Sequence, residues 1–197
     1  MEYIKVTSEN IEKEHICCAI SNNNDIQVAS KKAWLSERFE DGLVFLKSTE
    51  RGKCFIEYIP AENAWIPISA DGYMYIDCLW VAGSFKGHGY SSDLLNACIE
   101  DSKSKGKKGL CILAASKKKP FLAEPKFLKY KGFRVCDEAD NGFKLYRFFF
   151  RNTFNHRNIF RIEWTLTGII QNISFFFNAW LFGTFFKFWQ LYIFPKR

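Results

Sequence analysis

Two long apolar runs, with a helical pattern between them, dominate the hydrophobic pattern of the chain. Tyr73 to Val81 is almost continuously apolar and aromatic, broken only by Asp77, and its length suits a buried strand. Between residues 94 and 99, apolar side chains recur at the spacing of one helix face. Gly109 to Ala115 is the second apolar run, and a right-handed crossover would place it parallel to the first. The pattern therefore predicts strand, loop, helix and parallel strand at the centre of the fold.

Further elements are predicted on both sides of this centre. They are a strand at Tyr3–Val6, helices at Asn10–Ile20 and Ile26–Phe39, strands at Leu43–Lys47 and Cys54–Ile59, a helix at Phe121–Lys131, and closing strands at Phe133–Cys136 and Phe143–Tyr146. The fold class is α+β: a mixed, mostly antiparallel central sheet with one parallel strand pair, flanked by about four helices.

Aromatic residues and positive charge are concentrated in the C-terminal part of the chain. Of the 21 Phe, 13 lie in residues 148–197, and this stretch carries six Lys or Arg against one acidic residue. The net charge of +7 is therefore mostly a property of this tail. A basic body that binds nucleic acid is not indicated, so we expect no nucleic-acid partner.

The same composition leaves three interpretations of the tail open. Residues 168–186 contain no charged residue and come close to the length needed to cross a bilayer. Polar side chains within them, and basic residues at both ends, suit an interfacial helix equally well. Membrane contact through residues 164–194, packing against the body, and a non-native, frame-shifted tail are the alternatives. We expect two parts, a domain over residues 1–147 and an aromatic, basic tail over 148–197.

The N-terminus and the cysteines indicate the compartment. Charged residues interrupt the first apolar positions, so the N-terminus does not resemble a signal peptide. The seven Cys show no C-x-x-C spacing, so we expect no metal site, and a reducing cytosol is the simplest setting. We expect a cytoplasmic protein, with membrane association through the tail as the alternative. The sequence carries no signal for the oligomeric state.

A short glycine-rich loop links the first apolar run to the helical pattern. It contains Gly83, Gly87 and Gly89, and a strand, glycine loop and helix in this order can aim backbone N–H groups at a phosphate. It lacks the Gly-Lys-Ser/Thr of a Walker loop and the third glycine of a dinucleotide fingerprint. From these residues alone, a plain glycine turn before a helix is an equal alternative.

Two motifs carry a family resemblance. Residues 86–91, Lys-Gly-His-Gly-Tyr-Ser, resemble the pyrophosphate loop of the GNAT acyl-CoA N-acetyltransferases, Gln/Arg-x-x-Gly-x-Gly/Ala. That loop follows a strand ending in Val, and Val81 has the family spacing to Lys86. Residues 127–133, Phe-Leu-Lys-Tyr-Lys-Gly-Phe, resemble the family's late Phe-Tyr-x-x-x-Gly-Phe segment, and the element order also matches. The resemblance covers about residues 1–147, and within the family this part looks like the bacterial YoaP-like branch.

The resemblance implies a fold and an activity. The parallel strand pair would splay to admit acetyl-CoA, whose acetyl group would pass to a primary amine, of a small molecule or a protein, by direct attack. The strand end and the loop would bind this acyl donor; the expected residues are Leu79, Trp80, Val81, Lys86, Gly87, His88, Gly89, Tyr90 and Ser91. A non-catalytic acyl-CoA-binding module, possibly tethered to a membrane by the tail, is the alternative function.

The expected catalytic groups are where this chain departs from the family. Several relatives have a Glu that acts as the general base at the position of Tyr75. Asp77 lies two residues on, and because strand side chains alternate, it shares a face with Tyr75. Asp77 is the candidate general base, with a structural Asp as the alternative. Many relatives have a Tyr acid at the position of Leu128, which cannot donate a proton, so Tyr75 and Tyr130 are the candidate substitutes, along with Tyr90.

Overall fold

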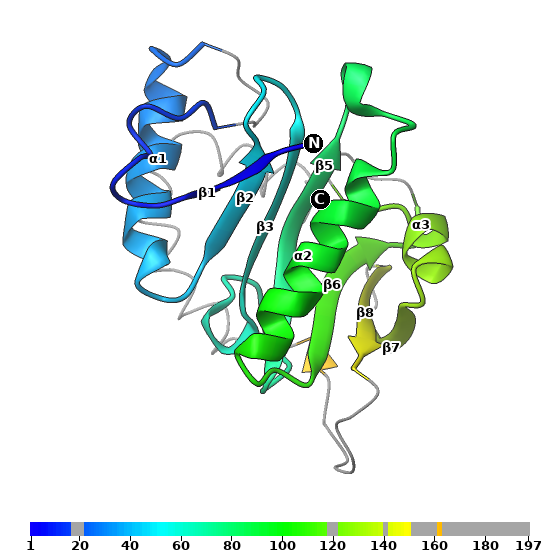
Figure 1. Cartoon of the computed structure of the whole chain (residues 1–197). Coiled ribbons are helices and arrows are strands. Elements are labelled where there is room, and N and C mark those ends of the chain that lie inside the picture. Colours follow the sequence, from blue (N-terminus) through cyan, green and yellow to red (C-terminus); the bar gives the residue numbers. More distant parts are fainter. Residues whose placement is uncertain (17–21, 118–121, 140–141, 151–160, 163–197) are drawn as a thin grey trace, which may run out of the picture.

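A computed structural model of the chain describes residues 1–16, 22–117, 122–139, 142–150 and 161–162 (Figure 1). Seven strands form one mixed sheet in the order β1-β2-β3-β5-β6-β8-β7. Neighbouring strands are antiparallel in every pair except β5 and β6, which are parallel. The predicted mixed, mostly antiparallel sheet with one parallel pair is therefore confirmed.

The elements follow the predicted order closely. The strands of the main sheet are β1 Tyr3–Val6, β2 Val44–Ser48, β3 Cys54–Pro60, β5 Tyr73–Val81, β6 Gly109–Ala115, β7 Arg134–Glu138 and β8 Phe143–Phe149. The helices are α1 Ile26–Phe39, α2 Tyr90–Ser104 and α3 Pro125–Tyr130, with short 3-10 turns η1 Ala61–Asn63 and η2 Gly83–Phe85. A second, two-stranded sheet pairs β4 Ile68–Ser69 with β9 Arg161–Ile162.

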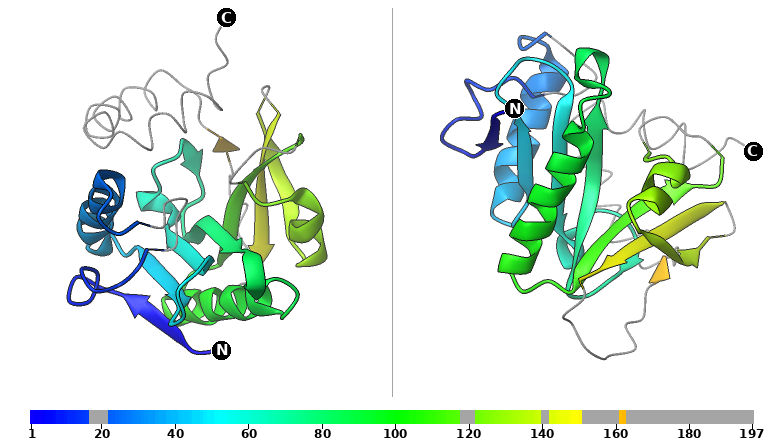
Figure 2. Two further views of the ribbon diagram at one scale, coloured as in Figure 1. Left: turned by 90° about the horizontal axis from the view of Figure 1, so that it is seen from above. Right: turned by 45° about the vertical axis from the view of Figure 1, so that its right-hand side comes forward.

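The helices cover opposite faces of the main sheet (Figure 2, left). Val28 and Leu35 of α1 belong to the hydrophobic core on one face. Leu94 and Cys98 of α2, together with Leu128 of α3, belong to the core on the other face. The apolar positions that predicted α2 are therefore the ones that it buries against the sheet.

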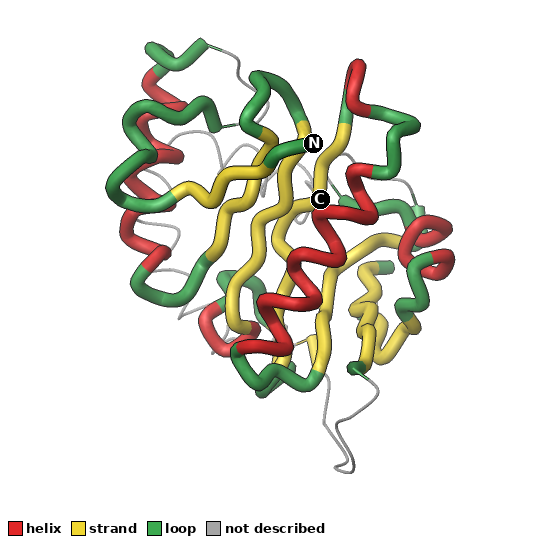
Figure 3. Tube along the Cα trace, in the orientation of Figure 1, coloured by secondary structure: helices red, strands yellow, loops and turns green. Residues whose placement is uncertain are grey.

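The segment after β1 differs from the prediction of a helix at Asn10–Ile20. Residues 10–13 form turns, residues 14–16 are irregular, and none of them is helical (Figure 3); the rest of that range lies outside the described residues. The Asn10 side chain accepts a hydrogen bond from the Thr7 N–H at 2.9 Å and donates one to the Lys5 carbonyl at 3.0 Å. Such local side-chain bonds to the backbone compete with a regular helix.

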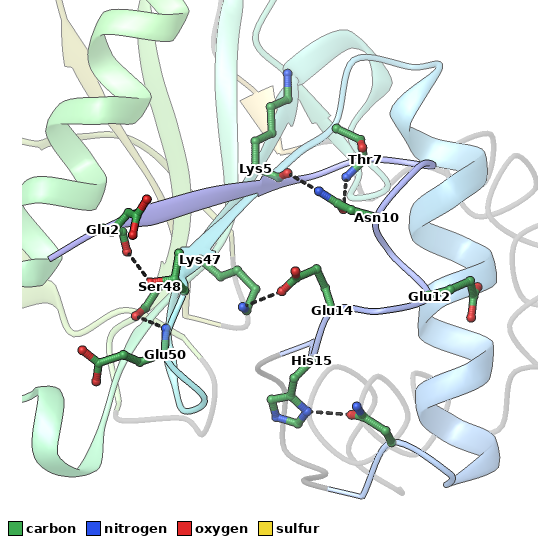
Figure 4. Close-up of polar contacts among 12 residues, drawn as sticks. Glu2, Lys5, Thr7, Asn10, Glu12, Glu14, His15, Lys47, Ser48 and Glu50 are labelled. Atoms are coloured by element: carbon green, nitrogen blue, oxygen red, sulfur yellow. Dashed lines mark hydrogen bonds and ion pairs between the residues drawn. The ribbon is translucent and has the colours of Figure 1, made fainter.

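Two buried lysines hold this segment to the body. The Lys47 side chain on β2 is 2% exposed, and its Nζ lies 2.9 Å from Oε2 of Glu14 (Figure 4). Lys32 of α1 donates a hydrogen bond to the Glu12 carbonyl at 2.7 Å. Because a buried ammonium is costly without a partner, these contacts hold the segment after β1 against β2 and α1.

The parallel strands β5 and β6 pair over only part of their length. Their register runs from the pair Tyr73 and Gly109 to the pair Tyr75 and Cys111. Beyond Tyr75, no strand in the described part of the chain pairs with β5 on this side, and the two strands diverge (Figure 2, right). Residues 77–81 of β5 are accordingly half-buried, whereas its first four residues are buried. The predicted splay of the parallel pair is confirmed.

At its other end, the sheet extends past the predicted domain boundary at residue 147. Strand β8 continues to Phe149, and the Phe148 ring centroid lies 5.4 Å from that of Phe133. Phe150 is buried, and its N–H donates to the Lys108 carbonyl at 3.1 Å. Residues 148–150 therefore pack with the body.

Most of the tail, including the predicted membrane contact through residues 164–194 and its frame-shifted alternative, lies outside the described residues. Within the described ranges, no helix has the length and apolar character needed to cross a bilayer. The expectations of a cytoplasmic protein and of a separate tail stay predictions.

Candidate functional site

The loop between β5 and α2 presents a row of backbone N–H groups. Gly83, Gly87 and Gly89 have φ values of +63°, +84° and +82°, in the left-handed region that favours glycine. Within the described part of the chain, no residue accepts a hydrogen bond from the backbone N–H groups of residues 87–91. A Cβ atom on any of the three glycines would meet nothing within 4 Å. The loop is therefore open, and with the positive end of the α2 dipole it suits an anion.

Aromatic rings within and next to this loop pack against one another. The His88 ring stacks on the Tyr90 ring, with centroids 5.5 Å apart. The buried Phe85 ring meets Tyr90 edge-on at 6.3 Å, and Gly52 approaches Phe85 so closely that a Cβ there would lie 2.3 Å from its Cε2. The Lys86 side chain is exposed. The His88 side chain thus packs on Tyr90, and the N–H groups of the loop stay accessible.

Lys131 brings a positive charge to the same helix end. Its Nζ donates a hydrogen bond to Oγ of Ser92, in the first turn of α2, at 2.5 Å. Lys131 lies inside the second family motif, but the sequence predicted no role in binding for it. Its proximity to α2 depends on how α3 packs, which the sequence pattern does not report.

The end of β5 leads directly into this loop. The side chains of Leu79 and Val81 pack toward the α2 face, and Trp80 packs toward the α1 face. On one edge these residues pair with β3, from the pair of Leu79 with Ile56 to that of Val81 with Cys54. Their other edge faces the splay. The three predicted strand positions therefore lead into the loop, and their role in binding stays a prediction.

Strand β5 contains a bulge at Asp77. Ile76 pairs with Tyr58 and Cys78 pairs with Glu57, so Asp77 is the extra residue of the ladder. The bulge shifts the alternation of side chains by one residue. Regular alternation would place Leu79 next on the α1 face after Asp77, but Cys78 lies on that face and Leu79 packs toward α2. Strict alternation predicted that Asp77 shares a face with Tyr75, and Tyr75 lies in the core on the α1 side.

Asp77 belongs to a charged cluster built from three elements. The Nζ of Lys31, on α1, lies 2.9 Å from Oε1 of Glu57, on β3, and the two side chains are 12% and 2% exposed. The Asp77 carboxyl group lies close enough to that of Glu57 for the two to interact. Burial, followed by the neighbouring Glu57 carboxylate, raises the pKa of Asp77 from 3.8 to about 7, although the Lys31 ammonium opposes the rise. A carboxyl group with this pKa can exchange a proton near neutral pH.

Neither Glu57 nor Lys31 was a sequence-predicted site residue. The only signal for Glu57 was a charged residue inside the apolar run Cys54–Ile59, the same signal that singled out Asp77. Lys31 had no signal, since Lys is common on the exposed face of a helix. Its contact with Glu57 arises from the packing of α1 on the sheet.

The candidate tyrosines lie in different environments. Tyr75 is buried, and desolvation, followed by the Asp77 charge, raises the pKa of its hydroxyl well above 10. Tyr130 is 83% exposed on α3, while Leu128, at the family position of the acid, is 1% exposed. The structure brings Tyr75 and Asp77 together and leaves Tyr130 outside their cluster. The catalytic roles of all three stay predictions.

Comparison with known proteins identifies the family. Residues 9–120 match the model described as the acetyltransferase (GNAT) family. The chain is also 47% identical over 146 residues to the uncharacterized N-acetyltransferase YoaP of Bacillus subtilis (strain 168), an alignment that covers 74% of this chain and 58% of that protein. The chain thus spans less than two thirds of this relative's length.

Solved structures share the fold at low sequence identity. Ribosomal-protein-alanine N-acetyltransferase from Brucella melitensis has a TM-score of 0.53 at 15% identity, and the match covers 76% of this chain and 100% of that one. A GNAT-family acetyltransferase from Staphylococcus aureus Mu50 has a TM-score of 0.51 at 14% identity, covering 74% of this chain and 96% of that one. The splayed strands and the open glycine loop agree with membership of the same family. Because residues 9–120 match the family model, the chain belongs to the GNAT acetyltransferase family.

Proposed function

We propose that this chain is an acyl-CoA-dependent N-acetyltransferase that moves an acetyl group from acetyl-CoA to a primary amine. The observation that carries this proposal is the placement of two features on one strand. The open, anion-binding loop follows the end of β5, and the titratable carboxyl group of Asp77 lies in the splayed part of the same strand. A donor anchored by its phosphates at the loop would extend along β5 toward Asp77.

The donor would bind mainly through backbone groups. The N–H groups of residues 87–91 would hold the pyrophosphate, with Lys86 and Lys131 adding positive charge near it. The edge of Leu79 to Val81 that faces away from β3 would bond the amides of the pantetheine arm as a neighbouring strand does. Family membership supports this assignment of acetyl-CoA as the acyl donor.

The chemical step would be direct attack on the thioester. Asp77 takes a proton from the acceptor ammonium, and the neutral amine nitrogen then attacks the thioester carbonyl carbon. A C–N bond forms and the C–S bond breaks; the attacking nitrogen gives up a second proton to become the amide, and the leaving thiolate takes up one proton, so that one proton in all is released through Asp77. Tyr75, which interacts with Asp77, is the proposed donor of that proton and would regain one from the attacking nitrogen, while Tyr130 would have to act from its exposed position. The acceptor is a small-molecule or protein amine.

A second function is favoured by Leu128. Its side chain is buried in the core on the α2 face and carries no proton, so the family's usual acid is missing at this position. A chain that kept the loop and lost the acid would bind acyl-CoA without turnover. Any membrane tether of such a module would involve residues outside the described ranges.

One experiment separates the two functions. The full chain is incubated with acetyl-CoA and a panel of small-molecule and peptide amines; release of the CoA thiol and formation of acetylated amine are both measured, and acetyl-CoA binding is measured by calorimetry. Binding together with equal amounts of thiol and acetylated amine supports the transferase. Binding without turnover on any amine supports the non-catalytic module. Absence of acetyl-CoA binding would overturn both.

A further inference from the structure

We propose that Lys31 is a positioning residue for the general base: by keeping Glu57 ionised beside Asp77, it makes Asp77 the carboxyl group that takes up and releases the proton. This inference rests on the proposed acetyl transfer. It assigns roles to two residues, on α1 and β3, that lie outside both family motifs.

The contacts of Lys31 place its positive charge next to Glu57. Its Nζ lies 2.9 Å from Oε1 of Glu57 and 4.0 Å from the centroid of the Trp34 ring, which faces the ammonium from the same helix. Both side chains of the ion pair are largely removed from water. A buried carboxylate is stable only when paired, and Lys31 is the cation that pairs with Glu57.

The bulge in β5 brings the second carboxyl group to this pair. Glu57 stands opposite Cys78, so the extra residue, Asp77, is displaced next to the Glu57 side chain. Asp77 is half-buried, in the part of β5 that has separated from β6, whereas Glu57 is buried. Of the two carboxyl groups, Asp77 is therefore the one on the side where an acceptor amine can arrive.

The charges of the cluster then determine where the proton sits. Lys31 faces Asp77 from α1, Glu57 from β3 and Tyr75 from its own strand, while Cys78 and Cys111 lie close to Tyr75. Two carboxyl groups in contact cannot both ionise easily, and without a nearby cation they share one proton. With Lys31 bound to Glu57, the negative charge is held on Glu57 and the exchangeable proton on Asp77.

This arrangement gives each group a step in the proton transfer. Asp77 accepts a proton from the acceptor ammonium, and the protonated Asp77 then donates a hydrogen bond to the Glu57 carboxylate. Lys31 stays protonated throughout and moves no proton. After acetyl transfer, Asp77 returns its proton to solvent, which restores the starting state.

The test uses variants whose effects on Asp77 have opposite signs. In Lys31→Met the loss of the positive charge should raise the pH at which the cluster releases its last proton, by roughly one pH unit or more. In Glu57→Gln the loss of the neighbouring negative charge should lower that pH by a similar amount, because Lys31 remains. Lys31→Arg keeps the charge and should leave the titration near that of the wild type.

Two readouts follow this titration. The first is the carboxyl carbon signal of Asp77 in protein labelled with ¹³C-aspartate, followed against pH without any substrate and assigned with Asp77→Asn. The second is the acid limb of the kcat/KM profile with a turned-over amine. Both should shift upward in Lys31→Met and downward in Glu57→Gln.

Lys47→Met is the matched control. It also removes a buried Lys from an ion pair 2.9 Å long, but its partner is Glu14, and Lys47 lies on β2. It should change stability and leave the Asp77 titration in place. A purely structural role for Lys31 predicts the same result for Lys31→Met, so an unmoved titration in that variant would overturn the inference. If Lys31→Met does not fold, Glu57→Gln still decides, because an unchanged or upward shift there contradicts the inference.

The two readouts also separate this inference from the proposed function. If the NMR titrations shift as expected and no amine is acetylated, the role of Lys31 in the cluster stands and the transferase proposal fails. If the wild type acetylates an amine and the titrations do not shift, the transferase stands and the role of Lys31 fails.

Discussion

Tyr75 faces Cys111 in the last pair that joins β5 to β6. From this pair onward the two parallel strands diverge, and β5 continues alone on that edge to Val81. Asp77 lies in this separated part, and the glycine loop follows it. A single strand therefore positions both the proton acceptor and the anion-binding loop of the proposed site.

The loop should bind acetyl-CoA through Gly89. At φ +82° a β-branched residue is strained, and its side chain would occupy the space over the loop's N–H groups. We expect Gly89→Val to weaken acetyl-CoA binding by about tenfold or more, which calorimetry measures. Gly106→Val is the matched control, because Gly106, at the other end of α2, also has a positive φ, +68°, and open surroundings. Equal losses of affinity in both variants would attribute the effect to strain and not to the loop.

Asp77 should carry the proton transfer. Asp77→Asn keeps the shape of the side chain, but it removes the proton acceptor. We expect the turnover number to fall by roughly 10²- to 10⁴-fold, with acetyl-CoA affinity nearly unchanged. Turnover and calorimetric affinity should be measured on one preparation. Wild-type turnover in a folded Asp77→Asn protein would exclude Asp77 as the base.

Asp77 should also shape the pH dependence of stability. The folded state keeps the Asp77 proton up to about pH 7, whereas in the unfolded chain this group has its ordinary pKa of 3.8. Between these pH values the folded state binds more protons, so the contribution of Asp77 to the free energy of unfolding falls as pH rises. The wild type should therefore lose stability relative to Asp77→Asn from pH 3.8 to about 7, and no further above that. Urea unfolding of both proteins across this range gives the difference; a difference that stays constant with pH would contradict the raised pKa.

Residues 148–150 should be needed for a stable domain. A chain ending at Arg147 loses the Phe148 ring that packs on Phe133 and the buried Phe150. A chain ending at Phe150 keeps both. We expect the longer chain to unfold cooperatively and the shorter one to be less stable by about 3 kcal/mol or more, as measured by urea unfolding. Equal stabilities would support the predicted boundary at residue 147.

The two partners of the ion pair in Figure 4 should contribute unequally to stability. The Lys47 side chain is 2% exposed and that of Glu14 is 23% exposed. Glu14→Gln leaves a buried ammonium without its carboxylate and should lower the free energy of unfolding by about 3 kcal/mol. Lys47→Met should cost less, because the remaining Glu14 can reach water. Chemical denaturation of both variants tests this order, and a larger loss in Lys47→Met would reverse it.

Several elements could be predicted because their signals are local. The bounds of α1, β5 and β6 agree with the predicted ranges, since helical spacing and continuous apolar runs lie within each segment. The glycine loop was predicted for the same reason, because left-handed positions and a helix start are encoded by adjacent residues. The predicted helix at Asn10–Ile20 was wrong for residues 10–16, where one side chain, that of Asn10, bonds to the backbone instead.

The sequence by itself determined which strand carries the proposed site: an acidic residue in a long apolar run, followed by glycines and an amphipathic helix, pointed to β5 and its loop. Only the tertiary structure decided what surrounds Asp77. The bulge depends on the register with β3, and the ion pair of Glu57 depends on a lysine from α1 that is distant along the chain. Register and side-chain contacts between distant segments are set by how the layers pack, and no pattern within a single segment records them.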